Sequence, residues 1–246
     1  MDPDDFIPPP PRVAVVIVAA GRGERLGELT PKQFLPLAGR PVFSYSLRFF
    51  GGLPFVVEIA LVHPPAGLPE AARAHVEGPA VPLRLVAGGA RRQDSVAAGL
   101  RALRAPFDVA LVHDAARPFP DRRATRLLAQ RAMETGGGLV ALPCPDTVKR
   151  AGNDGCVDAT LDRRTIWLAQ TPQAIRADYL GSALALMDSA EDWTDEAAVL
   201  ERLGLRVALV AGSSANFKIT TREDWLRAEA LADREALARP GLNQPK

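Results

Sequence analysis

Cysteine and histidine are both scarce in this chain, and their scarcity argues against two common kinds of site. The 246 residues include two cysteines, Cys144 and Cys156, and three histidines, His63, His75 and His113. Two cysteines cannot build a disulfide framework, and no Cys-x-x-Cys pair is present to hold a structural zinc ion. The histidines are scattered along the chain, so we expect no metal site with several histidine ligands.

An excess of one charge is also lacking, as is any long apolar run. The chain has 30 Lys and Arg against 29 Asp and Glu, whereas a sequence-independent nucleic-acid binder carries a basic excess. No apolar stretch approaches the roughly 20 residues of a membrane span. The start, MDPDDFIPPPP, is acidic and proline-rich, unlike a signal peptide. We expect a cytoplasmic enzyme that binds neither nucleic acid nor membrane, with residues 1–11 as a disordered arm.

Short β-rich apolar runs alternate with amphipathic stretches, which is typical of an α/β fold. Continuous Val, Ile, Leu and Ala runs indicate a mostly parallel sheet buried under helices on both faces. The predicted strands are Val13–Ala19, Val56–Val62, Leu83–Ala87, Val109–His113, Gly138–Leu142, Ile166–Gln170 and Arg206–Ala211. The predicted helices are Val42–Phe50, Pro69–Val76, Asp94–Leu103, Asp121–Met133, Ala177–Met187, Asp195–Leu203 and Arg222–Leu237. We predict one doubly wound, Rossmann-like domain over residues 12–238, then a tail at 239–246, with ligands beyond the carboxyl ends of the strands.

Residues 143–165 interrupt the alternation. Two short polar-rich segments flank Gly152-Asn153-Asp154-Gly155, whose residue types supply the positive φ values that a hairpin turn requires. A long surface loop fits the pattern equally well. Because an isolated two-stranded hairpin is marginal in water, an ordered hairpin here needs support, and a second subunit is the obvious source.

The stretch after the first predicted strand carries the strongest functional signal. That strand ends at Ala19-Ala20, and Gly-Arg-Gly-Glu-Arg-Leu-Gly follows, with Pro31-Lys32 further on. Small residues let backbone N–H groups approach a triphosphate closely, and basic side chains neutralise its charge. A dinucleotide-binding fingerprint requires glycine where Leu26 stands, and the Gly-Lys-Ser/Thr of a P-loop is absent. The loop therefore indicates a nucleotide site of another kind.

This loop resembles the A-A-G-x-G-x-R-x(5)-P-K motif of nucleotidyltransferases, and Gln33-Phe34 make it most similar to the 2-C-methyl-D-erythritol 4-phosphate cytidylyltransferase family. Further segments resemble family motifs in the same order, and the resemblance runs from about Val13 to Leu237. They are Val86–Val96 (VAGGARRQDSV), Val112–Pro118 (VHDAARP), Asp146–Lys149 (DTVK), Gln170–Gln173 (QTPQ), Thr194–Glu196 (TDE) and Asn216–Thr220 (NFKIT). Chance is a poor explanation for seven motifs in one order.

The resemblance implies transfer of CMP from CTP to 2-C-methyl-D-erythritol 4-phosphate with release of pyrophosphate, in the non-mevalonate route to isoprenoids. Such an in-line displacement depends on positioning and on charge stabilisation. By resemblance, Arg25 and Lys32 stabilise the α-phosphate in the transition state, and Arg163 and Lys218 place the incoming phosphate. The implied CTP contacts are Ala19, Ala20, Gly21, Gly23, Gly89, Ser95 and Ala115, and the implied acceptor contacts are Arg117, Thr147, Thr171 and Thr194. The family's arm reaches a partner subunit, which implies a homodimer through residues 143–165.

Asp114 is the predicted metal ligand, because it follows a buried strand at the ligand-facing edge of the sheet. Mg²⁺ usually takes one or two carboxylates together with substrate phosphates and water. An N-cap of the next helix is the alternative role for Asp114, and the pair Asp94-Ser95 could likewise be a helix N-cap as well as a nucleotide contact. His113 is expected to pack rather than to act as a base, because the attacking phosphate is already ionised.

The chain departs from the family pattern at two positions. Many members carry an acidic residue immediately before the Asn of the last motif, where this chain has Ala215. Some members also have an acidic residue after the second Gly of the GG motif, where Ala90 stands. These departures affect the expected metal and ribose contacts and leave the other motif residues in place.

Three rival interpretations remain at the level of sequence. A related cytidylyltransferase acting on ribitol 5-phosphate or another polyol phosphate would have the same nucleotide half. A non-catalytic nucleotide-binding protein could share the fold, although such a protein has no need to keep the basic and acidic motif residues together. A fusion to a downstream cyclase is not expected, because only a short tail follows Leu237.

Overall fold

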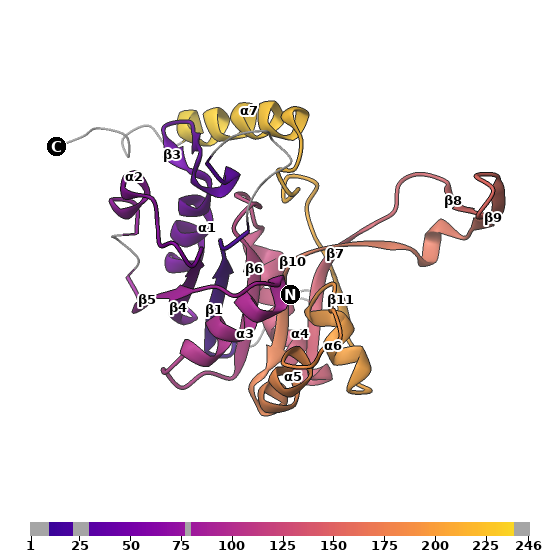
Figure 1. Cartoon of the computed structure of the whole chain (residues 1–246), viewed down its shortest axis with the longest axis horizontal. Coiled ribbons are helices and arrows are strands. Elements are labelled where there is room, and N and C mark those ends of the chain that lie inside the picture. Colours follow the sequence, from indigo (N-terminus) through magenta and orange to yellow (C-terminus); the bar gives the residue numbers. More distant parts are fainter. Residues whose placement is uncertain (1–9, 22–29, 77–79, 239–246) are drawn as a thin grey trace, which may run out of the picture.

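The computed structural model describes residues 10–21, 30–76 and 80–238. Its centre is a seven-stranded sheet with the strand order β11-β7-β10-β6-β1-β4-β5 (Figure 1). The strands are β1 (Val13–Val18), β4 (Val56–His63), β5 (Leu83–Ala87), β6 (Val109–Asp114), β7 (Gly137–Pro143), β10 (Trp167–Arg176) and β11 (Ala208–Ala211). All neighbours pair in parallel except β10, which runs antiparallel to both β6 and β7. The predicted mostly parallel α/β sheet is confirmed.

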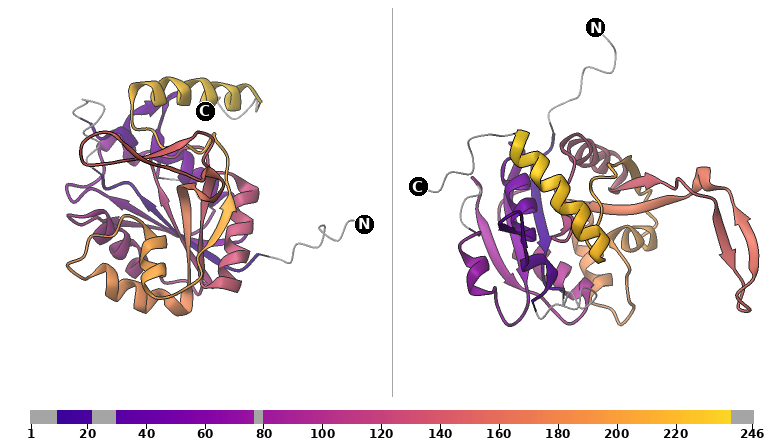
Figure 2. Two further views of the ribbon diagram at one scale, coloured as in Figure 1. Left: turned by 90° about the vertical axis from the view of Figure 1, so that its right-hand side faces the viewer. Right: turned by 90° about the horizontal axis from the view of Figure 1, so that it is seen from above.

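Helices cover both faces of the sheet, because successive residues of a strand point to opposite sides. In β1, Val13, Val15 and Ile17 join a core cluster with α1 and α4, whereas Ala14 and Val16 join a second cluster with α3, α5 and α6. The helices are α1 (Val42–Gly51), α2 (Glu70–Arg73), α3 (Arg92–Ala102), α4 (Arg122–Thr135), α5 (Leu180–Met187), α6 (Glu196–Arg202) and α7 (Arg222–Ala238). Figure 2 shows α7 lying across one end of the molecule. No helix in the described ranges is long and apolar enough to cross a membrane.

Strand β10 is longer than the sequence suggests. The prediction ended it at Gln170, yet the strand continues to Arg176. A proline lacks the N–H that a ladder requires, so Pro172 reads as the end of a strand. The structure accommodates it where the pairing with β7 is irregular, between Ala169 and Gln173. The extension matters because it includes Thr171, whose hydroxyl contacts Asp114 at the end of β6.

Three helices also differ in extent from the prediction. Helix α5 begins at Leu180 rather than at Ala177, after the 3-10 helix η5 (Ala177–Tyr179). The predicted helix Pro69–Val76 retains only the single turn of α2, whose N-terminus receives no side-chain hydrogen bond from Pro69. Helix α3 begins at Arg92, earlier than predicted, and the backbone N–H of Arg91 donates to Asp94 Oδ2 at 3.0 Å. Asp94 therefore lies inside the first turn and is not the N-cap residue.

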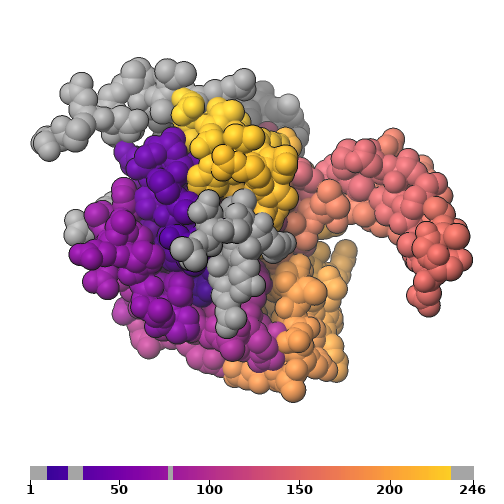
Figure 3. All heavy atoms as spheres, turned by 45° about the horizontal axis from the view of Figure 1, so that its top comes forward, coloured from indigo at the N-terminus to yellow at the C-terminus, as the bar shows by residue number. Residues whose placement is uncertain are grey.

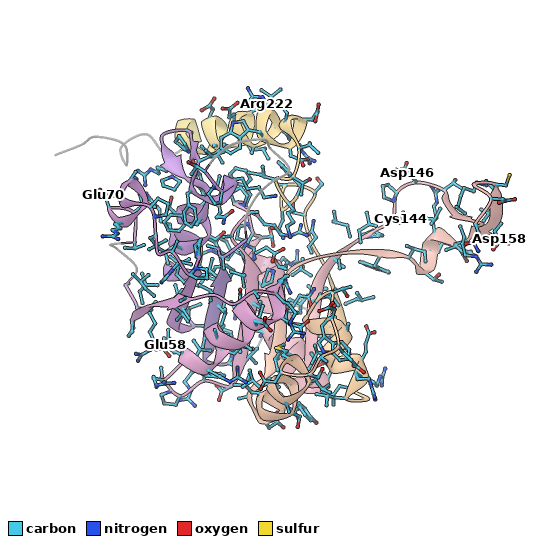
Figure 4. The ribbon with its side chains drawn as sticks, viewed as in Figure 1. Glu58, Glu70, Cys144, Asp146, Asp158 and Arg222 are labelled. Carbon is cyan, nitrogen blue, oxygen red and sulfur yellow. The ribbon has the colours of Figure 1, made fainter. Side chains whose placement is uncertain are left out.

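The segment between β7 and β10 forms a projecting arm. Its tip is a two-stranded antiparallel hairpin of β8 (Val148–Ala151) and β9 (Val157–Leu161), and the short 3-10 helix η4 (Arg163–Thr165) leads back to the body. Gly155, in the turn, has φ 80°, a conformation that favours glycine. Figures 1 and 3 show the arm standing clear of the body, and Figure 4 places Cys144, Asp146 and Asp158 along it.

Candidate active site

A cleft of about 990 Å³ lies beyond the carboxyl ends of β1, β4, β5 and β6. This is where doubly wound folds bind their ligands. Its walls come from the end of β1 and the loops that follow β4, β5 and β6, with one lysine from the segment after β11. The predicted site residues that line it are Ala20, Gly21, Lys32, Gly89, Ser95, Asp114 and Lys218. The fold thus gathers seven of the predicted positions around one cavity.

Gln33 fixes the floor of the cleft at the end of β1. Its side-chain amide donates to the carbonyl oxygens of Ala19 and Gly21, at 2.7 and 2.6 Å. These two hydrogen bonds fix the backbone conformation of residues 19–21, where the chain leaves β1. Lys32 opens the neighbouring 3-10 helix η3 (Lys32–Phe34), is 7% exposed and lines the cleft. A charged group in so confined a place favours a role with a bound anion.

The predicted residues Gly23 and Arg25 lie outside the described part of the chain. Their roles rest on the motif alone.

The glycine pair before α3 is required by packing within the protein. A Cβ on Gly88 would lie 2.4 Å from the Ala20 side chain, and one on Gly89 would lie 2.4 Å from the Asp94 side chain. The hydroxyl of Ser95 accepts the Gly89 N–H at 3.1 Å. Glycine therefore lets this loop fold tightly over the start of α3, which brings its backbone to the edge of the cleft.

Asp114, the last residue of β6, is positioned by a buried hydrogen-bonded chain. Its backbone N–H donates to Thr171 Oγ1 at 3.1 Å, and Thr171 Oγ1 lies 3.0 Å from His113 Nδ1. His113 Nε2 lies 2.9 Å from the carbonyl oxygen of Arg117. Since a carbonyl only accepts, Nε2 of the neutral ring donates to it, and Nδ1 accepts the Thr171 hydroxyl. Thr171 thus holds the backbone of Asp114 in place.

His113 is a packing residue, as expected. The ring is fully buried and lies 5.0 Å, centroid to centroid, from Phe50 in an edge-to-face arrangement. Burial lowers the pKa of His113 to about 4, so the ring stays neutral at physiological pH. A buried neutral ring with both nitrogens bonded has no proton to exchange with a substrate.

The Asp114 carboxylate belongs to a chain of alternating charges. Lys218 Nζ lies 2.7 Å from Asp114 Oδ2, and Arg92 Nη2 lies 3.1 Å from Asp114 Oδ1. Arg92 also donates to both oxygens of Glu196, at 2.6 and 3.2 Å. Burial alone would raise the pKa of Asp114, but Arg92 and Lys218 hold it well below its ordinary value. The cleft therefore presents an ionised carboxylate paired with two cations.

The alternative role of Asp114 as a helix N-cap is wrong. Helix α4 begins at Arg122, and Asp121 caps it by accepting the Ala124 N–H at 2.6 Å. Asp114 instead lies at the strand edge with its carboxylate in the cleft. The described residues contain no group of three or more His, Cys, Asp or Glu side chains placed to hold an ion.

The remaining predicted residues lie elsewhere. Ala19 and Ala115 are buried in the core beside the cleft, and Arg117 donates to the carbonyl oxygens of Asn216 and Ala169 at 2.9 and 3.4 Å. Thr194 is exposed just before α6. Thr147 and Arg163 are exposed on the arm, where Arg163 Nη1 donates to the Pro145 carbonyl oxygen at 2.6 Å. Within one chain, the arm residues and the cleft do not form a single constellation.

The structure adds three residues to which the sequence assigned no role: Gln33, Arg92 and Glu196. All three stand inside recognised motifs, so their positions were visible in the sequence. The structure adds a further observation on Arg92. It is the first residue of α3, where the helix dipole disfavours a positive charge, so helix formation does not account for it; the sequence, from which the helix was expected to begin at Asp94, did not reveal this.

Comparisons with known proteins agree with this geometry. The family model of 2-C-methyl-D-erythritol 4-phosphate cytidylyltransferase (IspD) matches residues 13–234. The protein of that name from Symbiobacterium thermophilum is 43% identical over 226 residues, covering 91% of this chain and 94% of its own. A bifunctional enzyme IspD/IspF from Rhodopseudomonas palustris (strain BisB5) is 44% identical, and the match covers 91% of this chain and 56% of that longer protein.

A solved structure leads to the same family. The crystal structure of 2-C-methyl-D-erythritol 4-phosphate cytidylyltransferase from Thermus thermophilus is similar to this fold with a TM-score of 0.74 and 33% sequence identity, covering 90% of this chain and 99% of that one. The family match spans the sheet, the cleft and the arm. The chain therefore belongs to the 2-C-methyl-D-erythritol 4-phosphate cytidylyltransferase family.

Proposed function

We propose that this protein transfers CMP from CTP to 2-C-methyl-D-erythritol 4-phosphate. An oxygen of the acceptor's phosphate forms a bond to the α-phosphorus of CTP, the bond from that phosphorus to the β-phosphate oxygen breaks, and pyrophosphate leaves. The observation that carries the proposal is the cleft, where Arg92 and Lys218 pair with Asp114 and where Lys32 and Gly21 line the same cavity. Cations held in a partly enclosed site suit the charge that develops in phosphoryl transfer.

The basic residues divide between the two phosphates. Lys32, together with Arg25 of the motif, stabilises charge on the α-phosphate of CTP as the bond to pyrophosphate breaks. Lys218 places the acceptor's phosphate, and its ammonium can exchange Asp114 for that phosphate because it is 35% exposed. No proton transfer is needed, because the attacking phosphate is already ionised. The Asp114 carboxylate keeps the cleft from becoming purely cationic, and Glu196, behind Arg92, offsets part of the charge of that arginine.

Magnesium is the cofactor that this reaction class implies, and the cleft can accept it. Asp114 is the protein residue that would hold the ion, with the other ligands coming from phosphates and water, as Mg²⁺ prefers. A bound ion neutralises charge on the triphosphate. Because both Asp114 oxygens are already paired with cations and Ala215 adds no carboxylate, Mg²⁺ should bind weakly until CTP is present. Calorimetry tests this, and tight Mg²⁺ binding without CTP would contradict it.

The arm supports the further proposal of a homodimer with composite sites. Thr147 and Arg163, the arm's predicted site residues, are exposed. No residue of the tip hairpin, from Val148 to Leu161, is buried, and Val157 is 64% exposed. A two-stranded hairpin of this kind gains stability by packing on another surface. We propose that the arm docks on a second copy of the chain and supplies Thr147 and Arg163 to that copy's cleft.

The organisation and location of the enzyme complete the proposal. Residues 12–238 form one nucleotidyltransferase domain, in which residues 143–165 are the dimerisation arm. We place the enzyme in the cytoplasm, in keeping with Cys144 and Cys156, both of which are free thiols.

A pyrophosphate-release assay tests the activity. CTP and UTP are each paired with 2-C-methyl-D-erythritol 4-phosphate and with ribitol 5-phosphate, with and without Mg²⁺. We expect the highest kcat/KM with CTP and 2-C-methyl-D-erythritol 4-phosphate. Faster turnover with ribitol 5-phosphate, or with UTP, would overturn the assignment, and release without any acceptor would indicate simple hydrolysis instead.

A further inference from the structure

Arg92 joins two buried carboxylates that come from different parts of the chain. Its guanidinium donates to both oxygens of Glu196, at the start of α6, and to Asp114 Oδ1, at the end of β6. The Glu196 side chain is 2% exposed and that of Asp114 is 12% exposed. A planar guanidinium can span two carboxylates in fixed directions, which the point charge of a lysine cannot do.

Glu196 is itself anchored, so it can serve as a fixed support for Arg92. The carboxylate of Asp195 caps α6 by accepting the Ala198 N–H at 2.9 Å, and the Gln173 side chain donates to Asp195 Oδ2 at 3.1 Å. Gln173 Oε1 also accepts the Ala197 N–H at 2.8 Å. Strand β10 thus holds the first turn of α6 in place.

The backbone of Asp114 is held by Thr171, but the orientation of its carboxylate depends on the side chains around it. Lys218 contacts one oxygen and Arg92 the other. If Lys218 turns toward an incoming phosphate, Arg92 is the contact that still orients the carboxylate. That contact leaves Oδ2 as the oxygen available in the cleft.

We propose that Arg92 is a positioning residue. Supported by Glu196, it fixes the orientation of the Asp114 carboxylate, so that Oδ2 is the oxygen presented to the cleft. The inference rests on the proposed function. It assigns a role to Arg92, which lines the cleft, and a supporting role to Glu196, which lies at the start of α6. It also explains a cation at the first position of α3, where the helix dipole opposes it.

The double variant Arg92→Gln/Glu196→Gln tests the proposal. Arg92→Gln alone leaves the buried Glu196 charge unpaired and should lower the melting temperature. The double variant removes both charges and keeps the net charge of the cleft, so its melting temperature and its KM for CTP should stay close to wild type. Its kcat should still fall about 10- to 100-fold, as is common when a residue that orients a site ligand is lost. Arg92→Lys, which keeps the charge, should recover part of the kcat.

Arg84→Gln is the matched control. Arg84 pairs with Glu58, a buried carboxylate outside the cleft that also accepts the Arg104 and Ala105 N–H groups. This variant should lose stability and keep kcat. A double variant that regains kcat along with stability would show a merely structural role for Arg92. A raised KM for CTP with unchanged kcat would show a direct substrate contact. Either result overturns the proposal.

A crystal structure of the double variant, soaked with inorganic phosphate so that an anion competes with Asp114 for Lys218, gives a readout that needs no turnover. We expect the Asp114 carboxylate to rotate or to occupy more than one orientation, and an unchanged carboxylate would overturn the proposal. An inactive wild-type protein with CTP and 2-C-methyl-D-erythritol 4-phosphate would count against the proposed function. The crystallographic result would still decide the role of Arg92.

Discussion

The cleft and the arm both carry ion pairs, but the pairs differ in their exposure to water. At the cleft, Arg92 pairs with Asp114 and Glu196, whose side chains are 12% and 2% exposed. On the arm, Arg150 and Asp158 form a pair at 2.7 Å with side chains 62% and 51% exposed. Exposed pairs contribute little because water and salt screen them, whereas breaking a buried pair leaves a charge without a partner. Buried ion pairs therefore hold the cleft in shape, whereas the exposed pair on the arm contributes little to the stability of the arm.

The comparison has a functional consequence. A cleft whose charges are paired within the chain can be formed before any ligand arrives, which suits the stabilisation of a transition state. An arm that lacks buried contacts of its own gains stability from another surface, and we propose that a second subunit provides it. The predictions that follow test each side of this contrast.

Lys32→Ala should have the largest effect, because Lys32 is a confined cation that we propose stabilises the α-phosphate. Loss of one preorganised charge-stabilising group commonly lowers kcat by about 10²–10³. Steady-state kinetics with saturating CTP and acceptor measures this, and circular dichroism checks the fold. Arg131→Ala, on the exposed face of α4 where Arg131 pairs with Glu134 at 2.6 Å, is the control and should keep its kcat. Normal kcat in the Lys32 variant would remove it from the mechanism.

The buried His113 should make the body of the protein sensitive to acid. Its pKa is about 4 in the fold and about 6.5 in an unfolded chain. The unfolded state therefore binds the proton more readily, and stability is lost as the pH falls from about 6.5 toward 4. Between pH 7.5 and 5 this amounts to roughly 2 kcal/mol. Urea unfolding should show this loss, with a flatter pH dependence in His113→Gln. Equal slopes for both proteins would assign the loss to other groups.

Much of this architecture could be predicted from the sequence. The strands of the sheet follow from their apolar runs, and Asp114 and Lys218, which their motifs assign to one site, line one cleft. The pairing of Arg92 with Glu196 could not be predicted, because the two residues are far apart in the chain and approach only when α3 and α6 pack on the same face. The continuation of β10 past Pro172 was also missed, since the local signal of a proline is to end a strand and only the pairing with β7 and β6 overrides it.

Subunit mixing tests the arm's side of the contrast. An Arg163→Ala protein lacks a functional arm residue, and a Lys32→Ala protein lacks a functional cleft. In a heterodimer with composite sites, the intact cleft of one chain meets the intact arm of the other. With random exchange, about a quarter of the wild-type activity should return. Verified subunit exchange without recovery would show that each arm serves its own chain or none.

The exposed pair on the arm should matter least. Arg150→Ala removes the contact to Asp158, and it should change the free energy of unfolding by less than about 0.5 kcal/mol, as exposed pairs usually do. Equilibrium urea unfolding at two salt concentrations measures this. A loss of several kcal/mol would show that charge organises the arm as well, and the contrast with the cleft would then fail.

The most direct test of the account follows the phosphorus atoms of CTP. The protein is incubated with 2-C-methyl-D-erythritol 4-phosphate and Mg²⁺, once with CTP labelled at the α-phosphate and once with CTP labelled at the γ-phosphate. Attack at the α-phosphorus predicts that the α label enters the product that contains the acceptor, while the γ label appears in pyrophosphate. Transfer of the γ label to the acceptor, or release of the α label as free CMP, would contradict the account.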